Sequence, residues 1–175
     1  MLAQLFLCVN AIINGGIVLK QLSILLLATI IMLTGCTNKQ AHQVEEILAQ
    51  RPFACEAIIK IGNNQYPSTI ERNEAGEVTV IVLPEKWTMP IIYKADAQQS
   101  NTTCGEYSLT DSVEDSPAAS VAVLLRQTLL RLAAQPAEKQ NDKFVAKSGG
   151  LSVIIDVNSQ KIEQISMPGI EITIA

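Results

Sequence analysis

The start of the chain is almost free of charge. Its first 35 residues contain one charged side chain, Lys20, and residues 21–33 (QLSILLLATIIML) form an apolar run. A charged residue followed by roughly 7–15 apolar residues is typical of an export signal, and this run is shorter than the roughly 20 residues that span a membrane. We therefore expect residues 1–35 to be a signal peptide that is removed from the mature chain.

The end of the apolar run has the residue types that lipid attachment requires. Leu33, Thr34, Gly35 and Cys36 resemble the lipobox of bacterial lipoproteins, in which an aliphatic residue and two small residues precede a cysteine. The lipid is transferred to a thiol, and small residues let the extended backbone enter the signal peptidase. The resemblance implies cleavage after Gly35 and a lipidated Cys36, whose acyl chains (palmitate among them) anchor the protein to the extracytoplasmic face of the cell membrane. The alternative is a membrane-anchoring helix with an incidental cysteine.

The sequence before Lys20 lacks the basic residues of an ordinary signal peptide. A true start near residue 18 or 19 would give a signal of ordinary length, so we expect the start to be over-extended. After the signal we expect a lipidated tether, 36–40, and a single domain, 41–175. Residues 36–175 hold 12 basic and 17 acidic residues, a net charge of 12 − 17 = −5. Without a cluster of Lys or Arg, nucleic acid is not an expected partner.

The hydrophobic periodicity predicts mostly short strands. Residues 41–50 read as an amphipathic helix that ends before Pro52, and the period then changes from helical spacing to two. About nine antiparallel strands follow, joined by short hairpins. Before the central helix we expect strands at 53–61, 65–72, 77–83, 90–95 and 104–109, and after it strands at 144–147, 151–157, 162–167 and 170–174.

A central helix is predicted between the two groups of strands. Asp115 or Ser116 is the expected N-cap, Pro117 opens the helix, and the pattern continues to about Ala134. The helix carries an apolar stripe that can be buried against a sheet. The stripe consists of Val121, Leu124, Leu125, Thr128, Leu129 and Leu132.

This order of elements resembles the lipoprotein-carrier half-barrels of the LolA/LolB superfamily, and in particular small clostridial lipoproteins thought to share that fold. The resemblance covers roughly residues 52–175. It is carried by FACEA at 53–57, IERNEAG at 70–76, VLPEKW at 82–87 with IIY at 91–93, and SPAASV at 116–121 with Leu124 and Leu125.

The resemblance implies an α+β fold in which a strongly curved antiparallel sheet of about nine strands forms a half-barrel. The N-terminal and central helices would lie on its concave face and enclose an apolar cavity for acyl chains. The residues expected to line that cavity are Phe53, Ile59, Val80, Val121, Leu124, Leu125, Leu132, Val153, Ile155 and Ile172.

No pattern in the sequence indicates catalysis or a cofactor. His42, the only histidine, is expected to be a solvated helix residue, and no Cys/His spacing suits a metal. Cys55 and Cys104 allow two interpretations, a disulfide or two separate core residues. Trp87 is either packed in the core or placed at the rim of the sheet, where it would face a membrane.

The sequence thus leaves two functions, neither of them enzymatic. The first is a membrane-anchored lipoprotein whose domain binds a lipid or other amphiphile in an apolar cavity. The second is a structural or protein-interaction lipoprotein of the cell envelope, with a filled core and no ligand.

Overall fold

The computed structural model describes residues 42–84, 88–113 and 120–175. Residues from Ala41 to Ala175 form one compact unit, separate from the first 40 residues, and the described hydrophobic core lies within it. A unit with its own core can fold independently. The predicted signal peptide, tether and lipobox (Leu33 to Cys36), together with Trp87, lie outside the described residues.

Most of the domain is β-structure. A helix begins at His42 and ends in a π-helical segment, η1 (Glu46–Gln50), and a second helix, α3 (Val121–Ala133), follows the sixth strand. The strands are β1 (Phe53–Ile61), β2 (Asn64–Arg72), β3 (Val78–Val82), β4 (Ile91–Ala95), β5 (Gln99–Cys104), β6 (Tyr107–Ser112), β7 (Ala137–Gln140), β8 (Lys143–Ser148), β9 (Leu151–Asp156), β10 (Ile162–Met167) and β11 (Ile170–Ile174).

All eleven strands belong to one antiparallel sheet. Their order is β6-β5-β4-β3-β2-β1-β11-β10-β9-β8-β7, so the sheet is open, with β6 at one edge and β7 at the other. Every pair but one joins strands adjacent in sequence. The exception is the pair of β1 and β11, in which Ile59 lies opposite Ile172. This pair unites the six strands before α3 with the five strands after it.

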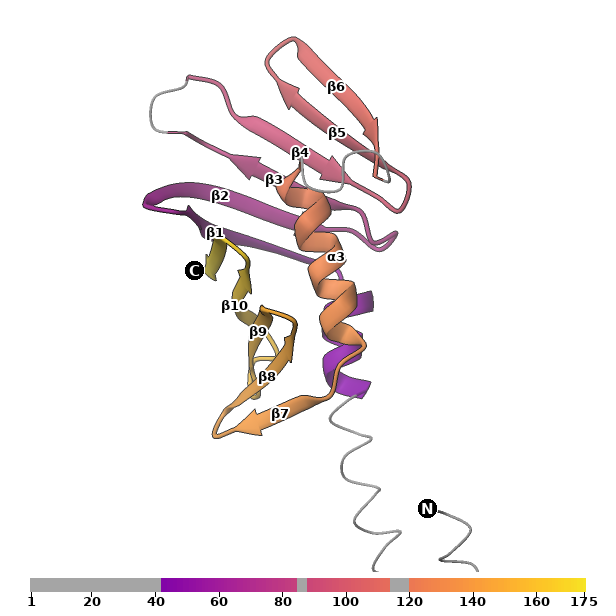
Figure 1. Cartoon of the computed structure of the whole chain (residues 1–175), viewed down its shortest axis with the longest axis vertical. Helices are drawn as coiled ribbons and strands as arrows, with labels where there is room; N and C mark the ends of the chain where they lie inside the picture. Colours follow the sequence, from indigo (N-terminus) through magenta and orange to yellow (C-terminus); the bar gives the residue numbers. More distant parts are fainter. Residues whose placement is uncertain (1–41, 85–87, 114–119) are drawn as a thin grey trace, which may run out of the picture. The chain divides into compact units, whose positions relative to one another are not determined.

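One face of the sheet, called here the inner face, is covered by α3. The helix contacts β3 and β4 on one side, β8 and β9 on the other, and η1 beside it (Figure 1). Strand β3 shows why the layers pack this way, because its side chains alternate between buried and half-buried positions. Val78, Val80 and Val82 point to the inner face and join the core, as the period-two pattern predicts.

The sequence predicted the helices in outline. The first helix buries Val44, Ile47 and Leu48 and ends before Pro52, as expected. The predicted N-cap, Asp115 or Ser116, and the predicted first residue, Pro117, lie outside the described residues. Helix α3 itself begins after Ser120, its N-cap, which has extended backbone angles (φ −126°, ψ 126°). The Ser120 side chain makes no capping hydrogen bond, and among the described residues its buried hydroxyl oxygen has no partner. The predicted end of the helix is confirmed, with Ala134 as the C-cap.

The prediction of about nine strands is too low. The predicted strand at 104–109 is wrong, because Cys104 ends β5, which pairs with both β4 and β6, and β6 begins at Tyr107. Gly105, at φ +60°, supplies the left-handed residue of the turn between β5 and β6. The short edge strand β7 has no apolar alternation and was also missed. Backbone pairing with a neighbouring strand, which a hydrophobic pattern does not record, forms these strands.

Two adjacent isoleucines of β1 test this assignment of faces. Ile59 is 1% exposed on the inner face and Ile58 is 45% exposed on the outer face. Ile59→Ala should lower the free energy of unfolding by about 2–5 kcal/mol, because it removes apolar contacts and leaves a cavity. Ile58→Ala should cost about 1 kcal/mol or less. Urea denaturation at neutral pH measures both values. Equal losses would mean that β1 presents its other side to the core.

Candidate functional site

The space between α3 and the sheet is apolar. All ten residues predicted to line a cavity belong to this region, so the sequence identified the side chains that gather there. Phe53, Val121 and Leu124 are partly buried at its periphery. The other seven are at most 1% exposed: Ile59, Val80, Leu125, Leu132, Val153, Ile155 and Ile172.

One buried residue of the described core carries a charge. Arg72, at the end of β2, is 6% exposed and follows Ser68 and Ile70 on the inner face of the strand. Its two terminal nitrogens donate hydrogen bonds to the carbonyl oxygens of Leu48 and Ala49, near the end of η1. These carbonyls lie at the end of a helix, which carries partial negative charge and lacks intrahelical donors. Arg72 therefore fixes η1 to the sheet.

A second arginine lies close to Arg72. Arg126 is on α3, and its Nε–H donates to the carbonyl oxygen of Gly76, 3.3 Å away, in the turn between β2 and β3. Gly76 has φ +78°, in the left-handed region that favours glycine. Burial lowers the pKa of Arg72, and the positive charge of Arg126 lowers it further. The two guanidinium groups thus repel one another in a partly desolvated setting.

Both arginines line a hollow of about 140 Å³ at the junction of η1, α3 and the β2–β3 turn. A water molecule takes up about 30 Å³ of liquid, so the hollow has room for a small polar group. Its remaining walls are apolar and small side chains or backbone: Leu48, Ala49, Ala75, Gly76, Val78, Leu129 and Leu130. We take this arginine hollow as the candidate site.

Sequence analysis did not identify the arginine hollow. A signal was present, because Arg72 falls at an inward position in a strand whose alternate residues are buried. A charged residue at such a position needs a special partner. Arg126 gave no signal, since a charged residue beside the apolar stripe of an amphipathic helix is ordinary.

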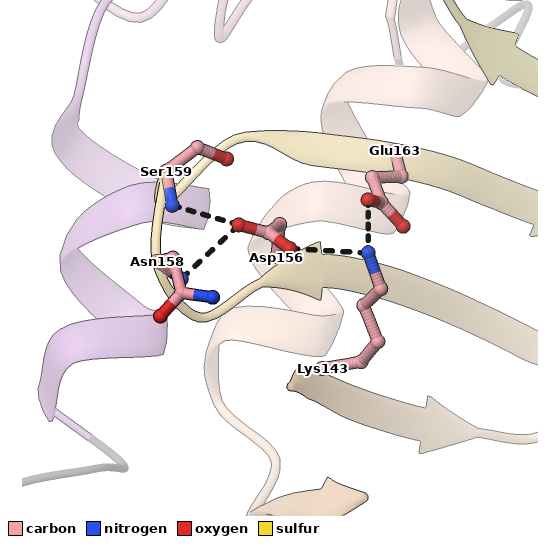
Figure 2. Close-up of polar contacts among 5 residues, drawn as sticks. All are labelled: Lys143, Asp156, Asn158, Ser159 and Glu163. Atoms are coloured by element: carbon pink, nitrogen blue, oxygen red, sulfur yellow. Dashed lines mark hydrogen bonds and ion pairs between the residues drawn. The ribbon is translucent and has the colours of Figure 1, made fainter. Parts of the chain in front are cut away.

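Figure 2 shows a second polar cluster, on the outer face of the sheet. Lys143 Nζ lies 3.1 Å from Asp156 Oδ2 and also contacts Glu163 Oε1. Asp156 Oδ1 accepts hydrogen bonds from the backbone N–H groups of Asn158, at 3.1 Å, and Ser159, at 2.7 Å. These bonds form an Asx turn between β9 and β10, so the cluster orders a hairpin. Within the described ranges, no group of three His, Cys, Asp or Glu side chains could hold a metal ion.

The two cysteines are free, so of the two interpretations the structure supports separate residues rather than a disulfide. Cys55 is on β1 and Cys104 is on β5, with three strands between them. Four strand spacings of about 4.8 Å separate them, whereas bridged Cα atoms lie within about 7 Å. Cys55 Sγ donates to the carbonyl oxygen of Ile70 at 3.8 Å, and burial raises the pKa of its thiol. A protonated thiol is a poor nucleophile.

The single histidine is a surface residue and does not line the arginine hollow. His42 is exposed and lies 3.9 Å from Glu45, one turn along the same helix. A solvated helix residue was the prediction, and it is confirmed. In the part of the chain that the structure describes, no helix has the length and hydrophobicity needed to cross a membrane.

Comparison with known proteins gives no family for this chain. No family model matches the sequence, and no curated protein matches it.

The Asp156 cluster predicts a specific acid sensitivity. The pKa of Asp156 is lowered to about 2, first by the Ser159 backbone N–H and then by Lys143, against about 3.9 in an unfolded chain. A lowered folded-state pKa adds stability that is complete above about pH 4 and is lost as the pH falls toward 2. Asp156→Asn should remove this part of the acid transition, which urea denaturation between pH 2 and 5 would measure.

The exposed Asp142, outside the cluster, supplies the control for that experiment. Asp142→Asn should leave the pH dependence of the unfolding free energy close to that of the unchanged protein. If Asp156→Asn and Asp142→Asn had the same acid profile, the cluster would not hold the Asp156 carboxylate in its charged form.

Proposed function

We propose that this protein is a membrane-anchored extracytoplasmic lipoprotein whose domain binds a lipid or other amphiphile against the inner face of its sheet. Attachment would occur through Cys36, where Leu33, Thr34 and Gly35 complete the lipobox pattern. The domain would act as a binding module held beside the membrane.

The observation that carries the binding proposal is an apolar inner face that extends past the strands that α3 contacts. The register places Tyr107 opposite Cys104 and Leu109 opposite Thr102. Through β5, β4 and β3, both residues share a face with Val80 and Val82. Tyr107 is 85% exposed and Leu109 is 62% exposed.

Exposed apolar residues next to a buried apolar layer favour association with an apolar ligand. Helix α3 contacts β3 and β4, whereas Tyr107 and Leu109 lie on the edge strand β6, two strands farther on. An acyl chain placed along this surface would bury these side chains. Each methylene removed from water contributes about 0.8 kcal/mol, so ten buried methylenes contribute about 8 kcal/mol before the costs of association, and we expect an affinity weaker than micromolar for chains of this length.

A second function is favoured by a different observation. The seven innermost predicted lining residues are at most 1% exposed, which suits a filled core. On that reading the protein is a structural or protein-interaction lipoprotein of the cell envelope, and the exposed face of β6 contacts a protein.

The anchor is tested by one substitution. Cys36→Ser should abolish metabolic labelling with palmitate and leave the precursor uncleaved, because the hydroxyl cannot form the thioether. Electrophoresis and membrane fractionation of cells that express the full chain measure both effects. Normal cleavage and membrane retention of the variant would contradict lipid attachment at this residue.

Amphiphile binding is tested on β6. Leu109→Ser should weaken binding of a long-chain alkanol to the domain from residue 41 onward about five- to ten-fold, because it removes an apolar contact. The fold should persist, since Leu109 is exposed. Ile58→Ser is the matched control, an exposed aliphatic residue on the outer face. Isothermal titration with alkanols of six to twelve carbons measures the affinity.

Affinity should rise about three- to four-fold for each added methylene in the unchanged protein. If no alkanol of this series binds, the binding proposal fails and the structural lipoprotein replaces it.

A further inference from the structure

Arg72 is a buried positive charge without a described counter-charge. It is 6% exposed, and within the described residues it forms no ion pair; its partners are the two carbonyl oxygens of η1. Carbonyl oxygens carry only partial charge. Burial of a cation is costly when no anion accompanies it. In capping η1, Arg72 uses two of the five N–H donors of its guanidinium group.

Arg126 increases this excess of positive charge. In the described part of the chain only its Nε–H has a hydrogen-bond acceptor, the Gly76 carbonyl. The pKa of the Asp96 carboxyl is lowered mainly by the backbone N–H groups of Gln99 and Gln98. The charge of Arg126 lowers this pKa only slightly. Asp96 and Arg126 form no ion pair. Among the described residues, the terminal N–H groups of Arg126 therefore have no acceptor, and the side chain lines the hollow.

The hollow between these two arginines has the chemistry of an anion site. Guanidinium groups bind carboxylate and phosphate oxygens through paired, charge-assisted hydrogen bonds. Apolar walls lower the local dielectric and strengthen such bonds. Two like charges in one place become favourable when an anion lies between them.

We propose that the arginine hollow binds an oxyanion, a carboxylate or a phosphate group, through Arg72 and Arg126. The anion is either the head group of a bound amphiphile or a free ion. The first case rests on the proposed function. It fits the edge of the hollow, where Leu130 is 41% exposed beside the arginines and would contact the start of an acyl chain.

The test uses the domain from residue 41 onward and three probes: inorganic phosphate, decanoate and the uncharged decanol. Phosphate should raise the melting temperature of the unchanged domain more than chloride does at equal ionic strength, because an anion bound to the folded state stabilises it. Decanoate should bind more tightly than decanol. Arg126→Gln should weaken the binding of phosphate or decanoate about ten-fold or more, measured by isothermal titration.

Arg131→Gln is the matched control. Arg131 is exposed on the same helix and lies over Gly149 in the turn between β8 and β9, away from the hollow. This variant makes the same change in net charge and should keep the affinity of the unchanged domain. Circular dichroism of both variants confirms the fold. Arg126 is preferred to Arg72 as the test position because loss of Arg72 also releases η1.

The outcomes separate the two proposals. Phosphate binding that is lost in Arg126→Gln supports the anion site even if no amphiphile binds, and the ligand is then a free ion. A preference for decanoate over decanol that is lost in the same variant identifies a head group. If phosphate does not stabilise the domain and decanoate binds no better than decanol, the anion site is overturned while amphiphile binding stands. Equal losses in Arg131→Gln would also overturn it.

Discussion

The apolar face of an open sheet must be shielded from water, and α3 shields the inner face by packing against it. The helix contacts β3 and β4 in one half of the sheet and β8 and β9 in the other, although β2, β1, β11 and β10 lie between these two pairs in the sheet. The burial of Leu125, Leu129 and Leu132 is therefore shared by both halves. The position of Arg126, and with it the arginine hollow, follows from the same contact.

The strands with strong apolar alternation were predictable from sequence. The bounds of β10 and β11 agree with the expectation, because both strands are rich in apolar residues and a Pro-Gly turn joins them, although a β-bulge near Ile162 interrupts the alternation of β10. Strands β5 and β6 break the rule. Their segments, QSNTTC and YSLTDS, are mostly polar; β5 is largely half-buried and β6 is largely exposed. β5 is stabilised by pairing with β4, and β6 by pairing with β5, so both strands depend on where the rest of the sheet already lies.

The core residues and the arginine hollow differ in what a sequence can reveal. Inward positions such as Val153 and Ile155 follow from local periodicity alone. Arg72 also occupies an inward position, but its partners are Leu48 and Ala49, more than twenty residues earlier in the chain, and Arg126, more than fifty residues later. A local sequence pattern cannot reveal contacts between residues so far apart along the chain. Only the packing of three elements at one corner of the sheet brings the two guanidinium groups together.

The pairing of β1 with β11 also sets an order of events during folding. Ala57 pairs with Ile174, next to the last residue of the chain, and the intervening segment must be traversed before that ladder forms. Loop closure over such a length is slow, so local hairpins such as β1–β2 and β10–β11 have time to form first. Until the last strand arrives, β1 presents an unpaired edge to any other strand. The folding chain is therefore most exposed to aggregation before β11 pairs, at the strand that later becomes the middle of the sheet.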